Sequence, residues 1–138
     1  MNTFENPSDT HIYDILAKPK TIAVVGCSPD PDRDSNQIAA LLKAKGHKMI
    51  PVNPNCEEIL GERCYASLQD IPEPVDMVDV FRRSEFVAQI ADEAIAQKAS
   101  ILWLQLGVID AAAACKAQEA GLTVVMDRCP AIEYRKLF

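Results

Sequence analysis

Residue types that mark several common protein chemistries are scarce in this sequence. The 138 residues include only five glycines and two histidines, and the glycines nowhere form the G-x-G-x-x-G loop that binds dinucleotides. The five cysteines are odd in number and contain no C-x-x-C pair, which argues against a disulfide framework and a zinc site. We therefore expect reduced thiols, as in a reducing compartment.

Long apolar runs are also missing. No run approaches the roughly 20 residues that cross a bilayer. The first ten residues, MNTFENPSDT, have neither the basic start nor the apolar stretch of a signal peptide. We therefore expect a cytoplasmic protein with no membrane partner.

The charge balance argues against another group of functions. The chain has 14 lysines and arginines against 20 acidic residues, a formal net charge of −6 at pH 7. Such a chain, with no basic cluster, is poorly suited to nucleic acid or an anionic membrane. A small anionic ligand is still compatible with it, because phosphate sites depend on local backbone N–H groups and one or two cations.

What the sequence does contain is a regular alternation of apolar runs and amphipathic segments, and we expect one domain over residues 1–138. Strands are predicted at residues 21–26, 47–54, 75–81, 100–107 and 122–127, and helices at 8–19, 34–46, 84–99 and 110–121. The candidate helix caps are Ser8 or Asp9, Asp34 or Ser35, and Ser84.

This alternation predicts an α/β fold with a Rossmann-like, doubly wound, five-stranded parallel sheet and helices on both faces, in three layers. The expected strand order is 3-2-1-4-5. Pro51, inside the second strand, indicates a sheet edge or a bulge. Such sheets bind ligands outside the carboxyl ends of their strands where the order reverses, which here is the crevice above Gly26.

The turn after the first strand has the features of an anion cradle. Gly26 lets the backbone approach a ligand closely, and Ser28 offers a hydroxyl. The N–H groups around Ser35 open a helix whose positive end favours an anion, and Arg33 adds a cation just before it. The motif is short, so a strand–helix turn that holds no ligand is an equal alternative.

NAD is disfavoured on two counts. The second and third glycines of its loop are missing, and the second strand ends Pro51-Val52-Asn53-Pro54 without the acid that grips the ribose hydroxyls.

Two further strand ends contribute to the crevice. Phe81 and Arg82 follow the third strand, where they can border an adenine and reach a phosphate. The alternative places Phe81 in the core and both Arg82 and Arg83 in solvent. Gln105 ends the fourth strand with an uncharged amide, and Gly107 supplies a turn after it.

No catalytic set emerges from these residues. Asp76 and Asp79 are three apart on one predicted strand, so their side chains face opposite sides and form no carboxylate pair. Cys27 lies near a helix start, where a thiol pKa can fall, and Cys129 is a second thiol near the crevice. Burial in an inert state is the commoner fate of both.

Five segments in register give the chain a family resemblance. They are VVGCSPDPDRDS, IPVNPN, EILGERCYASLQDIPEPVDMVDVFR, ILWLQLGV and AGLTVVMDRCPAIE. Together they resemble the small CoA-binding-domain proteins of the YccU-like family over nearly the whole chain. The implied fold is similar to the CoA-binding domain at the start of the succinyl-CoA synthetase α subunit.

The resemblance implies a site for CoA or acyl-CoA. By position, the pyrophosphate would face Gly26, Ser28 and Ser35, with Arg33 as a phosphate cation. The adenosine side would be lined by Asn53, Pro54, Phe81 and Arg82, and the pantetheine path would pass Gln105 and Gly107.

Two departures from the synthetase pattern bear on function. The basic residue expected after the second strand is replaced by Asn55-Cys56, so recognition of the third phosphate falls to Arg33 or Arg82, or is weak. The histidine that the synthetase phosphorylates belongs to a further domain, which these 138 residues do not contain.

We therefore expect a CoA or acyl-CoA binder without catalysis of its own. The alternatives are a redox or transfer protein that uses the CoA thiol through Cys27 or Cys129, and an interaction module with a vestigial crevice. An NAD(P)-binding protein is a distant fourth. A protein partner or a homodimer stays open, because the tail VVMDRCPAIEYRKLF can lie across the domain or seal a dimer.

Overall fold

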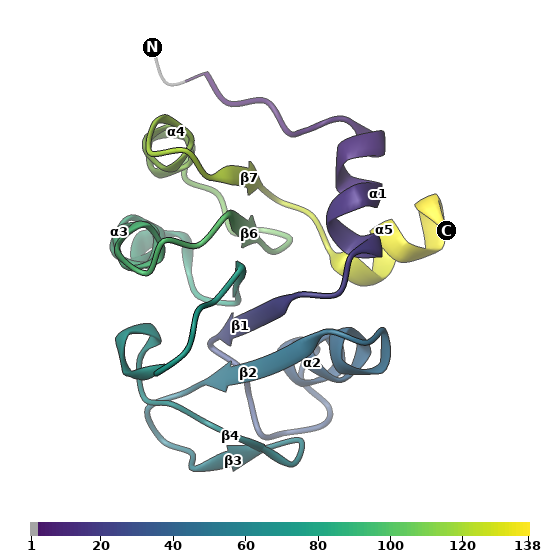
Figure 1. The fold of residues 1–138 in the computed structure, drawn as a ribbon, viewed down its shortest axis with the longest axis vertical. Helices are drawn as coiled ribbons and strands as arrows, with labels where there is room; N and C mark the ends of the chain where they lie inside the picture. Colours follow the sequence, from purple (N-terminus) through teal and green to yellow (C-terminus); the bar gives the residue numbers. More distant parts are fainter. Residues whose placement is uncertain (1–2) are drawn as a thin grey trace.

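A five-stranded parallel sheet forms the middle of three layers (Figure 1). The computed structural model describes residues 3–138. The strands of the sheet are β1 (Thr21–Val25), β2 (Lys48–Val52), β5 (Met77–Val80), β6 (Ile101–Leu104) and β7 (Thr123–Val125). The helices are α1 (Asp9–Ala17), α2 (Asp34–Ala44), α3 (Val87–Ala96), α4 (Ala111–Glu119) and α5 (Pro130–Leu137). The Rossmann-like α/β class predicted from the sequence is confirmed.

The segment between β2 and β5 is irregular, as its many helix-breaking residues predict. It contains a small antiparallel hairpin of β3 (Glu58–Ile59) and β4 (Glu62–Arg63) and a short 3-10 helix, η1 (Leu68–Asp70). A second 3-10 helix, η2 (Ser84–Phe86), leads into α3.

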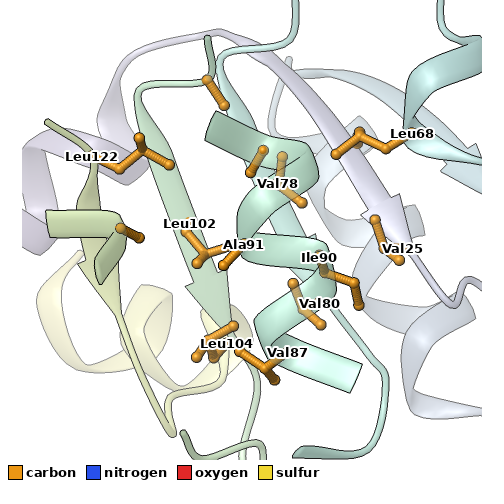
Figure 2. Close-up of a cluster of buried hydrophobic side chains, with 14 of the residues drawn as sticks. Val25, Leu68, Val78, Val80, Val87, Ile90, Ala91, Leu102, Leu104 and Leu122 are labelled. Atoms are coloured by element: carbon orange, nitrogen blue, oxygen red, sulfur yellow. The ribbon is translucent and has the colours of Figure 1, made fainter. Parts of the chain in front are cut away.

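Helices cover both faces of the sheet, with α3 and α4 on one side and α1, α2 and α5 on the other (Figure 1). Successive strand residues point to opposite faces, so Val78 and Val80 pack toward α3 while Met77 faces the other helices. Figure 2 shows Ile90 and Ala91 of α3 in the hydrophobic cluster to which Val78 and Val80 belong. Every strand residue of β5 and β6 is buried, which is typical of parallel strands covered on both faces.

The strand order differs from the prediction. The sheet runs β2-β1-β5-β6-β7, so the third predicted strand lies beside the first and not beyond the second. Pro51 gives the physical reason. Its carbonyl points away from β1 and accepts a hydrogen bond from the N–H of Tyr65. Its missing N–H therefore falls on the same outer side of β2, where no ladder bond to β1 is lost. The prediction of an edge at Pro51 is confirmed, and the 3-2-1-4-5 order, which made this strand internal, is wrong.

At the far side of the sheet, the N-terminal segment binds the chain just after β7. The side-chain amide of Asn6 donates to the carbonyl of Met126 (2.9 Å) and its oxygen accepts from the Met126 N–H (2.7 Å). The segment before α1 therefore lies against the chain just after β7.

Two predicted helix starts need correction. Ser8 does cap α1 by accepting from the His11 N–H. At α2, however, the N-cap is Arg33 and not Asp34 or Ser35, because the Ser35 hydroxyl is used by the preceding loop. At α3, the helix begins at Val87 and Ser84 opens η2 instead. The Ser84 hydroxyl accepts from the Ile109 N–H (2.9 Å) and so ties the loop after β6.

The C-terminal segment lies across the domain as α5, which packs on α1. A buried hydrogen-bond chain joins them. His47 Nδ1 accepts from the Lys20 N–H (3.3 Å), so its Nε2–H donates to Tyr134 Oη (2.9 Å), which donates to the Leu16 carbonyl (3.2 Å). Burial lowers the pKa of His47, in keeping with a neutral ring. Among residues 3–138, no helix combines the length and apolar character needed to cross a membrane.

Candidate functional site

The ends of β1 and β5 meet at the point where the strand order reverses. The Phe81 N–H donates to the Val25 carbonyl (2.8 Å), so the two strand ends are in register. Gly26 has φ +85°, and a Cβ at that position would lie 2.6 Å from the Phe81 carbonyl oxygen. Glycine is thus required here by its backbone conformation and by the close approach of the neighbouring loop.

The β1–α2 loop (residues 26–33) is held by side chains from outside it. The Ser35 hydroxyl accepts from the Ser28 N–H, and the Asn36 amide donates to the Ser28 carbonyl, both at 2.9 Å. On the opposite side, the Asn53 amide donates to the Cys27 carbonyl (2.9 Å). The backbone of the loop is therefore fixed before any ligand arrives. The sequence pattern places the backbone of Asn36 at the helix start but misses this role of its side-chain amide.

The N-terminus of α2 opens directly beyond this loop. Arg33 occupies the N-cap in an extended conformation and makes no side-chain cap bond. The N–H groups of a first helical turn have no partner within the helix, and together with the helix dipole they favour an anion. Asp30, Asp32 and Asp34 stand around Arg33, so it is the single cation of a locally acidic segment.

Two pockets flank the strand ends. The first, here called the β2–α3 pocket, has a volume of about 300 Å³. Its lining includes Gly26, Pro54, Leu68, Arg82, Phe86 and Ile90. The second, here called the α2–α5 pocket, has a volume of about 510 Å³. Its lining includes Ile38, Phe81, Arg82, Gln105, Ile132 and Arg135. Both volumes fall in the range of small-molecule sites.

Arg82 is the side chain that the two pockets share. Its guanidinium lies over the ring of Phe86, 4.3 Å from the centroid, a favourable cation–π arrangement. Of the ten predicted site residues, Gly26, Pro54, Phe81, Arg82 and Gln105 line one or both of these pockets. The structure therefore brings half of the predicted set onto two adjoining cavities.

The other five predicted residues lie around the pockets without lining them. Ser28, Ser35 and Asn53 shape the β1–α2 loop as described, and Arg33 begins α2. Gly107 is exposed, with φ +79°, and its N–H donates to Asp127 Oδ1 (2.8 Å). Gly107 thus fixes the loop after β6.

A buried carboxylate lies behind the α2–α5 pocket. Gln105 is only 4% exposed and its side-chain amide donates to Asp79 Oδ1. Asp79 is fully buried, and its Oδ2 has no hydrogen-bond partner among the described residues. Burial raises the pKa of Asp79 to about 7, against a smaller lowering by the Gln105 hydrogen bond. Asp76 instead accepts from the Thr21 N–H (2.8 Å), so the two acids form no pair.

The cysteines do not form a reactive centre at the loop. Cys27 is fully buried, and burial raises the pKa of its thiol to about 12. Such a thiol is not ionised near neutral pH, which argues against the hypothesis that Cys27 acts as a thiolate. Cys129 is the N-cap of α5 and is half-buried on the α2–α5 pocket.

Arg63, on β4, is a second residue that the sequence analysis missed. Together with Cys56 it lines a surface hollow that shares Ala66 with the β2–α3 pocket. It therefore supplies a cation close to the position where the family resemblance expects one and the sequence has Cys56. Only the β3–β4 hairpin brings Arg63 there, and that two-residue pairing leaves no periodic signal.

Comparison with known proteins decides the family. Residues 20–135 match the family described as the CoA binding domain. The chain belongs to the CoA-binding domain family. This confirms the resemblance inferred from the five segments.

Relatives place this CoA-binding domain chain among both small proteins and larger enzymes. It is 42% identical over 125 residues to the uncharacterized protein YneT of Bacillus subtilis (strain 168), an alignment that spans 91% of this chain and 93% of that one. A hypothetical protein from Pyrococcus horikoshii OT3 has a similar structure, with a TM-score of 0.91, 37% identity and 99% coverage of each chain. An ADP-forming acetate–CoA ligase II of Archaeoglobus fulgidus is 39% identical over 80 residues, which are 56% of this chain and 12% of the ligase.

Proposed function

We propose that this protein binds CoA or acyl-CoA at the carboxyl ends of β1 and β5, without catalysis of its own. The observation that carries the proposal is the β1–α2 loop. Its backbone is fixed by Ser35, Asn36 and Asn53 next to a helix N-terminus with no side-chain cap. In a chain of the CoA-binding domain family, that arrangement fits a site for the pyrophosphate.

The proposed pyrophosphate contacts are the backbone at Gly26, the Ser28 hydroxyl and the first turn of α2 at Ser35. Ser28 already accepts from the Asp30 N–H (3.1 Å), which holds its oxygen at the loop surface. Arg33 supplies the cation. With three aspartates beside it, the loss of Arg33 would leave the segment strongly negative and unfavourable for phosphate.

The rest of the ligand would follow the two pockets. We place the adenosine at the β2–α3 pocket, bordered by Pro54 and Arg82, with Asn53 at its rim. The pantetheine arm would then pass Phe81 and Arg82 toward Gln105 and the loop at Gly107. This path is supported by Arg82, which lines both pockets. Arg33, Arg82 and Arg63 are the cations available to the third phosphate.

NAD is disfavoured by the structure of the same edge. Where NAD-binding folds place an acid at the tip of the second strand, this chain has Asn53. Both ends of its amide are occupied, since it donates to the Cys27 carbonyl and accepts from the Asn55 N–H (2.8 Å).

Titration calorimetry with CoA, dephospho-CoA, adenosine and NAD at one salt concentration tests this proposal. We expect CoA to bind, dephospho-CoA to bind more weakly and NAD not to bind. Arg33→Ala should lower the affinity for CoA about tenfold, the value of one charge-assisted phosphate contact, and leave the affinity for adenosine unchanged. Lys116→Ala is the control, because Lys116 lies on α4 and pairs with Asp92 (2.8 Å) away from the site. Equal losses for CoA and adenosine would contradict the role of Arg33. No heat with any of the four ligands would favour the interaction module.

A second candidate function is favoured by the position of Cys129 on the α2–α5 pocket. There its thiolate could attack CoA disulfide, forming a protein–CoA mixed disulfide and releasing one CoA thiolate. Intact mass after exposure to CoA disulfide checks this, with Cys129→Ser expected to abolish the adduct. An unmodified parent protein would count against it.

A further inference from the structure

The proposed path of CoA accounts for only part of the lining of the α2–α5 pocket. It offers about 510 Å³, against about 300 Å³ for the β2–α3 pocket, and the CoA proposal uses only Phe81, Arg82 and Gln105 of its lining. The remaining walls come from α2, α5 and the loop after β6. The proposed CoA contacts leave these walls uncovered.

Part of the wall is apolar. Ile38, Phe81 and Val108 line the pocket together with Leu106 and Ile132. Two of these large side chains, Leu106 and Ile132, are 56% and 41% exposed. Apolar side chains that line a cavity and still face water favour an apolar ligand group that covers them.

The charged residues that line the same pocket are mainly cations, beside the two amides Gln37 and Gln105. Arg82, Arg83 and Arg135 line it, with Asp34 the one acid in the lining, although acids outnumber bases 20 to 14 in the chain. Arg83 makes only a long contact to Glu85 (3.8 Å) between two largely exposed side chains. Arg135 makes no ion pair among residues 3–138. Guanidinium groups bind carboxylates through paired N–H donors.

The two pockets adjoin at Arg82. A thioester whose nucleotide lies in the β2–α3 pocket extends past Arg82 with its sulfur end, and the group attached to that sulfur is the acyl chain. The pocket that follows therefore combines an apolar group of side chains with three arginines. An acyl group with an apolar body and an anionic end matches both properties.

We propose that the α2–α5 pocket receives the acyl group of an acyl-CoA and selects chains that end in a carboxylate. This inference rests on the proposed function, because the nucleotide site sets the direction in which the thioester enters. Arg135, on α5, is the specificity residue for the distant carboxylate, and Arg83 is a second arginine of the same lining.

Calorimetry with CoA, hexanoyl-CoA and adipoyl-CoA tests the inference, because the two acyl groups have six carbons each and differ in the terminal carboxylate. Adipoyl-CoA should bind about tenfold more tightly than hexanoyl-CoA, and Arg135→Gln should remove that preference while CoA itself binds as before. Lys136→Gln is the matched control. It removes a charge from the next residue of the same helix, which pairs with Asp9 (3.2 Å) and does not line the pocket. Arg83→Gln serves as a second variant if Arg135→Gln does not fold.

The remaining outcomes separate this inference from the proposed function. If CoA binds and neither thioester binds more tightly, the acyl pocket is overturned while the CoA site stands. If both thioesters bind more tightly than CoA by the same factor, selection of a carboxylate is overturned. If Lys136→Gln removes the preference as fully as Arg135→Gln, the role of Arg135 is overturned. If none of the three ligands binds, the proposed function fails and this inference fails with it.

Discussion

Gly26 lies closer to a neighbouring backbone than any other glycine of the chain. A Cβ there would meet the Phe81 carbonyl at 2.6 Å, whereas at Gly107 it would meet nothing within 4 Å. Both residues have positive φ. The pair therefore separates the energetic effect of backbone conformation from that of close packing between the β1 and β5 ends.

We expect Gly26→Ala to lower the free energy of unfolding by about 3 kcal/mol or more, and Gly107→Ala by about 1 kcal/mol. Both variants carry the strain of a left-handed alanine, but only the first also pushes two strand ends apart. Urea unfolding of the parent and both variants measures this. Similar losses in the two variants would mean that the contact with Phe81 relaxes freely.

Asp79 gives a pH dependence of known sign. Its pKa of about 7 in the folded protein exceeds the value of about 4 of an unfolded aspartate. The folded chain thus holds an extra proton between these pH values, and its stability falls as pH rises from about 4 through 7.

We expect Asp79→Asn to remove this fall, because a neutral amide keeps the partner Gln105 without burying a charge. The variant should match the parent in unfolding free energy at and below about pH 4, exceed it by a growing amount as pH rises through 5 to 7, and exceed it most at pH 8. Unfolding curves at pH 5, 6, 7 and 8 check the difference between the two proteins, in which contributions from other groups cancel. A difference that stays constant with pH would contradict the assignment.

At the scale of elements, the β1–α2 loop depends on side chains that lie on other elements. Asn36 of α2 and Asn53 after β2 each bind a loop carbonyl. The shape of the loop is therefore a property of three elements packed together and not of its own residues.

We expect Asn36→Ala to weaken CoA about tenfold and to lower the unfolding free energy by about 1 to 2 kcal/mol, because it releases the Ser28 carbonyl. Ser8→Ala is the control, since it removes the cap of α1 at a comparable stability cost of about 1 kcal/mol and lies outside the site. The two measurements are calorimetry and urea unfolding. If both variants weaken CoA equally, the loop bond has no role in binding beyond stability.

The elements themselves were largely predictable, because their signals are local. Strands such as β1 and β6 are short continuous apolar runs, and the helices follow caps and apolar spacing. Helix starts were less predictable where several capping residues are adjacent. Ser35 is a good cap by type, yet its hydroxyl is used by Ser28, seven residues earlier. No local pattern records that bond.

At the scale of the whole molecule, the strand order and the site depend on contacts distant in sequence. Pro51 indicates an edge strand or a bulge, and β2 does lie at the edge, which excludes the order 3-2-1-4-5 with its internal second strand. The Asp79–Gln105 pair follows from the β5–β6 register, which sets Asp79 opposite Trp103, two residues before Gln105. Single-sequence patterns contain no such register. Predicted residues at strand ends, such as Gly26 and Arg82, reached the pockets because the carboxyl ends of parallel strands share one edge.

The hydrogen-bond chain through Tyr134 joins α5 to the last turn of α1, at Leu16, and to His47 just before β2. We expect Tyr134→Phe to lower the unfolding free energy by about 1 to 3 kcal/mol, because the buried Nε2–H of His47 and the Leu16 carbonyl both lose their partner. Tyr13→Phe is the matched control. Tyr13 is 42% exposed and stacks on Phe138 through its ring. We therefore expect Tyr13→Phe to lower the unfolding free energy by no more than about 0.5 kcal/mol. Thermal and urea unfolding check both variants, and equal losses would contradict a role for the Tyr134 hydroxyl.

The two outer strands of the sheet, β2 and β7, also bear on how this protein behaves when it is concentrated. At β2, proline removes a donor and Tyr65 takes the carbonyl of Pro51. Beyond β7, Asn6 takes both backbone groups of Met126. Open strand edges are the usual starting points of edge-to-edge aggregation. This chain blunts the β2 edge with a proline, and its N-terminal segment occupies the backbone just after β7. Copies that crowd together are thus hindered from joining their sheets at β2.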